Sequence, residues 1–269
     1  MLSRILPGIL GLTASALYFS STSNQECSLA ETAVLSILIG FFTFVIYQLG
    51  SRIAIFNRQQ KNGKKIESAF LIAPFAIAAI YPFDHPAFLL KSIPQLSVSA
   101  ILTVAYYRPM NYGLSFINGL REIPMMKNVV LALAWSLATT PFTAERTETL
   151  YLLIFRTLFI LALSIAIDIR DRQSDSKQNT MTLALMIGSR NCAMASSSIL
   201  LLAAVLAGTT LSMPDDSWWL PLIIPAHTII TALGVLSLHE RSKPITYFWT
   251  VDFQLFLHAL LFLLIRLTL

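Results

Sequence analysis

Long apolar stretches are the feature that most constrains what this chain can fold into. Of its 269 residues, 55% are hydrophobic and 12% are charged, and the mean hydropathy is +0.68. A water-soluble protein of this size does not tolerate such a composition. A helix that crosses a membrane needs roughly 20 predominantly apolar residues. The candidate stretches are Ile5–Ser20, Leu29–Leu49, Ser68–Pro82, Ala87–Tyr107, Pro124–Pro141, Leu150–Ile167, Cys192–Leu211, Trp218–Leu238 and Tyr247–Leu267.

We therefore expect an all-α fold, a polytopic membrane helical bundle of about nine transmembrane helices that forms a single domain over residues 1–269. The third stretch contains Pro74 and the fourth contains Lys91 and Pro94, so their boundaries are the least defined. The first stretch follows Arg4 and ends in small residues, which is also typical of a secretory signal. The loop charges favour its retention as the first helix.

Lysine and arginine residues gather in alternate loops between the stretches, and cytoplasmic loops carry an excess of both. We expect the basic side to be cytoplasmic, with the N-terminus inside and the C-terminus outside, in a multi-pass integral membrane protein. In a bacterium this would be the inner membrane. No continuous basic patch with interleaved aromatic residues occurs, so we expect the lipid bilayer and no nucleic acid as a partner. The basic side holds Arg4, Arg52, Arg58, Lys61, Lys64, Lys65, Arg108, Arg121, Lys127, Arg170, Arg172, Lys177, Arg190, Arg241 and Lys243.

The stretch IDIRDRQSDSKQNTMTLALMIG, residues 167–188, places three aspartates directly after an apolar run. Asp168, Asp171 and Asp175 have the spacing i, i+3 and i+7, which falls within roughly 60° of arc on a continued helix. We expect all three to face one direction. Carboxylates this close repel each other unless a cation bridges them, and Mg²⁺ takes a few carboxylate oxygens together with substrate phosphates.

A second interpretation of the same stretch needs no metal ion. Asp168 and Arg172 form an i, i+4 pair, and Arg170 and Lys177 lie close by in the sequence. These basic side chains could neutralise the acids in a solvated cytoplasmic loop. Spacing alone leaves both interpretations open.

The pattern D-x-x-D-x-x-x-D, followed by Thr-Leu a few residues before a glycine, resembles the second aspartate-rich motif of the UbiA superfamily of intramembrane prenyltransferases. The segment LREIPMMKNVVLALAW, residues 120–135, is similar to that family's entry into its fifth helix, and YFWTVDFQLFLHALLF resembles its last helix more weakly. The resemblance implies a lipid-embedded UbiA-type bundle that holds an isoprenyl diphosphate through Mg²⁺. Diphosphate would leave, and the allylic carbocation would alkylate an aromatic or other lipophilic acceptor.

Carried over by position, the resemblance assigns a role to several residues of this chain. It implies that Thr182 and Gly188 are structural, and that Tyr107 lies near the diphosphate or belongs to an interfacial aromatic belt. The implied catalytic metal ligands are Asp168, Asp171 and Asp175. The candidate substrate-binding residues are Gln48, Arg52, Tyr107, Lys127, Arg172 and Lys177.

The first aspartate motif of the family, N-x-x-x-D-x-x-x-D, is absent from the second apolar stretch. Aligning Gln48 with the asparagine places Arg52 and Phe56 where the aspartates belong, and no acid lies between Glu31 and Glu67. The guanidinium could bind diphosphate in place of a second Mg²⁺, or it could extend to lipid headgroups as an interfacial residue. Alternatively, the chain is a degenerate relative that binds a prenyl lipid or quinone without transfer chemistry.

Ionisable residues inside the apolar stretches are rarely accidental in a membrane. Arg156 could pair with Asp252 or point into a cavity, and a structural ion pair is at least as plausible on sequence grounds. His227 and His258 are more typical of satisfied packing residues than of ligands.

Overall fold

The protein is described by a computed structural model over residues 97–99, 101–102, 123, 125–140, 146–177, 181–210 and 220–268. Throughout these ranges the regular structure is helical and no strand occurs, which confirms the predicted all-α class for this part of the chain. The first three apolar stretches and most of the fourth lie outside it, so nine spans remain a prediction. The helices are α5 (Met126–Thr139), α6 (Arg146–Lys177), α7 (Leu183–Ile187), α8 (Ser189–Thr210), α9 (Leu220–Leu236), α10 (Pro244–Tyr247), the π-helix η3 (Phe248–Asp252) and α11 (Phe253–Thr268).

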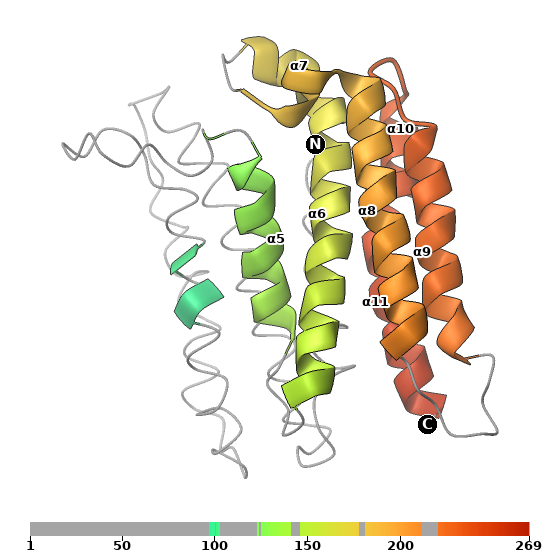
Figure 1. Ribbon diagram of the computed structural model, residues 1–269. Helices are drawn as coiled ribbons and strands as arrows, with labels where there is room; N and C mark the ends of the chain where they lie inside the picture. The colour runs from blue at the N-terminus through green and yellow to red at the C-terminus, as the bar shows by residue number, and fades with distance from the viewer. Residues whose placement is uncertain are drawn as a thin grey trace, which may run out of the picture.

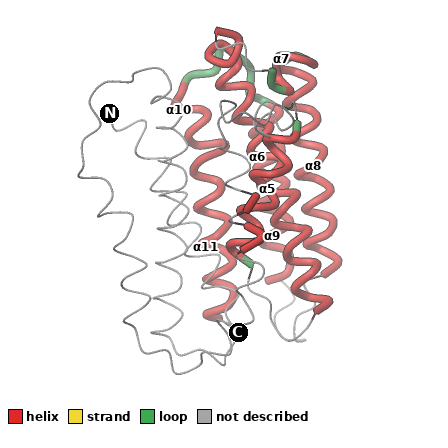
Figure 2. Tube along the Cα trace, turned by 90° about the vertical axis from the view of Figure 1, so that its left-hand side faces the viewer, coloured by secondary structure: helices red, strands yellow, loops and turns green. Residues whose placement is uncertain are grey.

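The long helices lie side by side with alternating chain direction, and the short helix α7 lies across one end of the bundle (Figures 1 and 2). Helix α8 packs against both α6 and α9, α5 packs against α6, and α11 packs against α9. Because the direction alternates, the start of α5, the end of α6, the start of α8 and the α9–α10 connection meet at the same end. This end, at the top of Figure 1, is called the charged end below.

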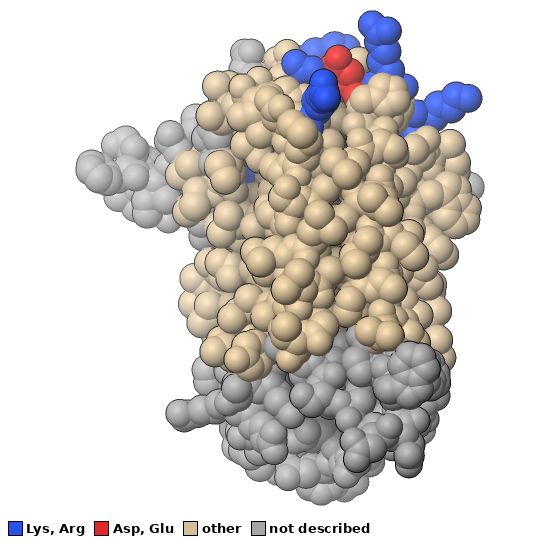
Figure 3. Space-filling view, turned by 45° about the vertical axis from the view of Figure 1, so that its right-hand side comes forward, with Lys and Arg blue, Asp and Glu red and all other residues tan. Residues whose placement is uncertain are grey.

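Helices that are long and apolar enough to cross a membrane cover Thr149–Lys177, Ser189–Thr209 and Pro244–Ile265, and two shorter apolar helices accompany them. Their outer faces carry exposed aliphatic side chains such as Val205 and Leu233. Lysine, arginine and acidic side chains gather at the charged end, above a surface of other residues (Figure 3). A bilayer solvates such a surface, whereas water does not. The chain is therefore an integral membrane protein.

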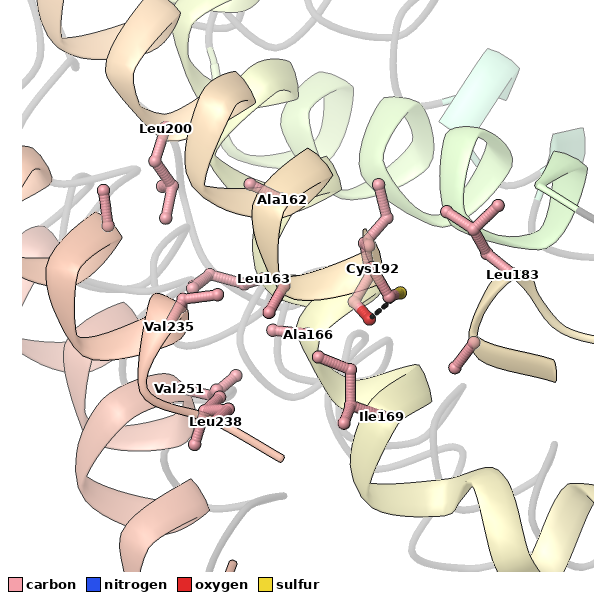
Figure 4. Packing of buried hydrophobic residues seen from close by; sticks show 14 of the residues in the cluster. Ala162, Leu163, Ala166, Ile169, Leu183, Cys192, Leu200, Val235, Leu238 and Val251 are labelled. Atoms are coloured by element: carbon pink, nitrogen blue, oxygen red, sulfur yellow. Dashed lines mark hydrogen bonds between the residues drawn. The ribbon is translucent and has the colours of Figure 1, made fainter. Parts of the chain in front are cut away.

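Small side chains hold α6 against α8. Ser196 donates a hydrogen bond to the Ala162 carbonyl oxygen at 2.7 Å, and the Cys192 sulfur lies 3.5 Å from the Ile165 carbonyl oxygen, a contact visible in Figure 4. Apolar burial contributes little between helices in lipid, so close backbone approach and interhelical hydrogen bonds carry the packing. The buried Ala166 continues the same contact one turn further along α6.

Helix α6 continues ten residues past Ile167 to Lys177, so all three aspartates lie on a helix as expected and not in a loop. Helix α7 follows, a short element that the apolar pattern did not predict. Its N-cap Thr182 is fully buried, and its carbonyl accepts the first backbone hydrogen bonds of α7. Gly188 then joins α7 to α8 with a φ of 81°, a conformation that residues with a side chain rarely adopt.

Candidate functional site

A partly buried lysine joins the start of α5 to the end of α6. The Lys127 Nζ lies 2.6 Å from Asp168 Oδ1 and 3.8 Å from Asp175 Oδ2. The Asn128 amide donates to Asp168 Oδ2 at 2.9 Å. We call these four residues the Lys127 cluster. The Asp168 side chain is only 2% exposed, so both of its oxygens rely on protein donors.

The helical geometry explains why these side chains meet. Asp168 and Asp175 are seven residues apart, which places them two turns apart on one face of α6. Helix α5 runs antiparallel beside that face and presents Lys127 from its first turn. Two carboxylates withdrawn from water need a nearby cation. In this arrangement an ammonium group supplies the positive charge.

Asp171 has a different partner from the other two aspartates. Its Oδ1 lies 3.0 Å from Arg170 Nε, and the same guanidinium lies 3.5 Å from Asp252 Oδ2 in η3. The Asp171 side chain is 45% exposed. Asp168 and Asp175 therefore share a partner, whereas Asp171 does not join them. The assignment of all three as metal ligands remains a prediction.

The other predicted substrate-binding residues are spread over different places. Arg172 pairs with Glu240 and lies 3.4 Å from the Ser189 hydroxyl, while Lys177 is exposed as the last residue of α6. Neither belongs to the Lys127 cluster. The remaining candidates, Gln48, Arg52 and Tyr107, lie outside the described residues.

Magnesium, which the resemblance implies, finds part of a ligand set in the Lys127 cluster. Asp168 and Asp175 offer two carboxylates, and Mg²⁺ is commonly held by one or two carboxylates together with waters and substrate phosphates. Within the ranges that the structure describes, no group of three or more His, Cys, Asp or Glu side chains could hold a metal ion. These donors therefore fit a Mg²⁺ ion that is shared with a diphosphate. Among the described residues they supply too few ligands for an ion held by protein groups alone.

Arg156, buried inside α6, does not make the pair with Asp252 that we considered. Its guanidinium donates to the Thr139 carbonyl oxygen and, at 3.2 Å, to the Thr140 hydroxyl, while Asp252 pairs with Arg170. Carbonyl groups at a helix C-terminus lack helical partners and attract cations. Arg156 therefore closes the end of α5, and the sequence pairing failed because it ignored that terminus.

Two histidines that the sequence treats as separate packing residues form one buried chain of hydrogen bonds. The Gln254 Nε2 donates to the Trp249 carbonyl oxygen at 2.8 Å, so its Oε1 faces His227 Nε2, also at 2.8 Å, as an acceptor. His227 then carries a proton on Nε2, and in the neutral form its Nδ1 accepts from His258 Nδ1 at 2.9 Å. His258 also stacks on Phe159 with ring centroids 4.0 Å apart.

The positions of the histidines contain a signal that could have revealed this contact. Each lies near the middle of its apolar stretch, in the eighth and ninth stretches along the chain. The midpoints of antiparallel neighbouring helices lie at the same depth. A polar residue at each midpoint therefore predicts a buried pair.

A solved membrane enzyme has a similar fold. The structure described as digeranylgeranylglyceryl phosphate synthase in membranes matches with a TM-score of 0.57 and 15% sequence identity, and the match covers 100% of this chain and 97% of that one. That enzyme is a UbiA-superfamily prenyltransferase. At this identity the likeness establishes a UbiA-type fold. No protein-family model matches the sequence, and no curated protein matches it either.

Proposed function

Because the chain has a UbiA-type fold, we propose that it transfers an isoprenyl group from an isoprenyl diphosphate to a lipophilic acceptor within the membrane. The observation that carries the proposal is the Lys127 cluster, which gathers one cation and two carboxylates where α5 begins and α6 ends. The D-x-x-D-x-x-x-D pattern on α6 supports the same function by resemblance. An aromatic compound or another electron-rich lipid is the acceptor class.

Each member of the cluster has a role in this reaction. Lys127 donates hydrogen bonds to phosphate oxygens, and Asn128 holds the Asp168 carboxylate in place. Asp168 and Asp175 would hold a Mg²⁺ ion, which neutralises the charge that develops on the departing diphosphate. The bond between the first prenyl carbon and the diphosphate oxygen breaks, the acceptor forms a new bond to that carbon, and the acceptor's proton leaves with the diphosphate. The apolar bundle excludes water from the carbocation.

A second function, binding of a prenyl lipid without transfer, is favoured by one observation. The Asp168 oxygens are already engaged by Lys127 and Asn128, so the protein neutralises this carboxylate by itself. The acid-free interval from Gln48 to Gln60 points the same way, because it removes the first aspartate motif. A lipid-binding relative would retain the fold and would release no pyrophosphate.

The test is incubation of the purified, reconstituted protein with radiolabelled farnesyl or geranylgeranyl diphosphate, with and without Mg²⁺. Bound label and released pyrophosphate are measured separately. We expect Asp168→Asn to weaken binding in the presence of Mg²⁺ roughly tenfold or more, because the variant loses one of the two carboxylates that would hold the ion shared with the diphosphate. Asp252→Asn is the matched control, since it removes a partly buried acid that pairs with Arg170 and not with Lys127.

Equal binding by the parent and by Asp168→Asn would refute the assignment of the cluster to the diphosphate. Binding that needs Mg²⁺, together with pyrophosphate release by the parent, supports transfer. Binding with no release in the presence of several aromatic and lipid acceptors supports the non-catalytic function.

A further inference from the structure

A second charged feature of the charged end lies outside the Lys127 cluster and shares no residue with it. It is a hollow of about 340 Å³ lined by Arg172 at the end of α6, by Ser189 and Arg190 in the first turn of α8, and by His239, Glu240 and Arg241 in the α9–α10 connection. We call it the arginine pocket. Three chain segments that are far apart in sequence therefore converge on it.

The charge of the arginine pocket is unbalanced. Glu240 neutralises Arg172, because the two side chains form an ion pair. Arg190 and Arg241 are exposed, and within the described ranges no carboxylate lies within ion-pair distance of either guanidinium. Three guanidinium groups against one carboxylate leave a net charge of +2 with the histidine neutral. Such a hollow attracts an anion.

The neutral donors of the arginine pocket select the same kind of anion. The Ser189 hydroxyl lies 3.4 Å from Arg172 Nη1 and opens helix α8, which is 22 residues long. The first N–H groups of a helix have no helical partners and carry partial positive charge. Arginine side chains, a hydroxyl and a helix N-terminus together form hydrogen bonds with tetrahedral phosphate oxygens.

Apolar side chains on neighbouring elements place the arginine pocket at the depth of lipid headgroups. Met186 and Ile187 of α7 are exposed next to Gly188, and Ile245 and Trp249 are exposed just after the α9–α10 connection. Tryptophan is enriched where a membrane meets water. Figure 3 shows the basic side chains of the charged end directly above such an uncharged surface. An anion bound here can be part of a lipid.

We propose that the arginine pocket is a binding site for a phosphate group, separate from the isoprenyl diphosphate site and independent of prenyl transfer. Arg190 and Arg241 bind the phosphate oxygens, and Arg172 stays fixed by Glu240 beside them. Two sources supply the same chemistry, which are the headgroup of an anionic phospholipid and free inorganic phosphate.

The test uses full-length protein that has been purified and stripped of lipid in detergent, with no isoprenyl diphosphate in any sample. Short-chain phosphatidic acid, short-chain phosphatidylcholine and inorganic phosphate are added separately, and bound molecules are counted by native mass spectrometry. We expect the parent to bind phosphatidic acid in preference to phosphatidylcholine. Arg190→Gln and Arg241→Gln should each weaken this binding roughly tenfold, since each loses charge-assisted hydrogen bonds.

Lys243→Gln is the matched control, because Lys243 is exposed two residues from Arg241 and does not line the pocket. Displacement of phosphatidic acid by inorganic phosphate identifies the free anion as a ligand, and its failure to displace identifies the headgroup. The proposal is overturned if Lys243→Gln weakens the binding of phosphatidic acid as much as the two arginine variants do. It is also overturned if the parent binds neither phosphatidic acid nor inorganic phosphate better than phosphatidylcholine. A protein that binds phosphatidic acid but transfers no prenyl group would refute only the proposed enzymatic function.

Discussion

The two ends of helix α5 are each joined to α6 by a basic side chain, and the two ends differ in what that side chain binds. At the first end, Lys127 of α5 contacts the carboxylates of Asp168 and Asp175. At the other end, Arg156 of α6 donates to the Thr139 carbonyl oxygen and the Thr140 hydroxyl. Both contacts tie the same pair of helices together.

The difference shows which end can change partners. A carbonyl group at a helix end belongs to the backbone and cannot move without unwinding the helix, so the Arg156 contact is a fixed structural element. The Lys127 contact is made between side chains, which can rotate. Phosphate oxygens can replace carboxylates around an ammonium group, and a divalent ion can replace the ammonium group between carboxylates. The first end is therefore suited to ligand binding.

The largest effect is expected from Lys127→Met, which would break the contact between side chains at the first end of α5. It leaves the buried Asp168 and the partly buried Asp175 without their ammonium partner, and removing one side of a buried ion pair costs about 3–5 kcal/mol. Thermal unfolding of the reconstituted protein, followed by circular dichroism, measures the loss. Added Mg²⁺ should restore stability to this variant and change the parent little. If Mg²⁺ changed the stability of Lys127→Met and of the parent equally, the idea that Mg²⁺ and the Lys127 ammonium group occupy the same position would be contradicted.

Arg156→Met would break the fixed end, with a somewhat smaller loss. The Thr139 carbonyl would lose its side-chain donor, and we expect a loss of about 1.5–3 kcal/mol in all, the range for one hydrogen bond to a charged group. We expect Mg²⁺ to give no rescue here. The folded fraction, isolated by gel filtration, should bind isoprenyl diphosphate with the affinity of the parent. If Mg²⁺ restored the stability of Arg156→Met, the two ends of α5 would not differ in their ability to exchange a basic side chain for a metal ion.

Ser196→Leu tests whether the uncharged contact between α6 and α8 also contributes to stability. The larger side chain would push α8 away from Ala162, and overpacking of this kind costs about 1–3 kcal/mol. Ser198→Leu is the control, because Ser198 lies on the same helix but is exposed. The thermal midpoint should fall in the first variant only. Equal midpoints for the two variants would show that the charged contacts alone position α6.

Arg170→Gln should have the smallest effect. Its contacts with Asp171 and Asp252 are partly exposed, and such pairs contribute about 0–1 kcal/mol. The variant also releases Asp171 for other partners, so a Mg²⁺ titration of diphosphate binding would show whether this third carboxylate joins the site. A loss of stability as large as that of Lys127→Met would remove the distinction between the buried and exposed pairs.

The apolar stretches predicted the positions of the described long helices because span length and hydrophobicity are local properties. Helix α5 falls inside the stretch Pro124–Pro141, and α9 falls inside Trp218–Leu238. Helix α7 was missed because its five residues are too short to show a period. The end of α6 followed from the aspartate spacing, which places the acids on one helical face.

The contacts of the site were harder to predict because they join residues far apart in the chain. Lys127 and Asp168 are separated by 41 positions in the sequence. Only the antiparallel order of the fifth and sixth apolar stretches indicates that the start of the fifth lies beside the end of the sixth. The Arg156 pairing went wrong because the sequence shows acids clearly, whereas it does not show which carbonyl groups are left without donors. The contact between His227 and His258 also joins distant residues, and it could be predicted only by noting that both lie at the middle of neighbouring apolar stretches.

The π-helix η3 has a consequence for how the C-terminal helix must be handled in any engineering. A π-turn holds one more residue than an α-turn, so it shifts the angular phase of everything after it. Winding the same five residues, Phe248–Asp252, as regular α-helix would turn α11 by about 100° relative to α9, whereas deleting one of them would keep α11 near its present rotation. In the first case the downstream side chains would change faces. His258 would swing away from His227. Alignments that treat this segment as continuous α-helix therefore assign the wrong faces downstream of it.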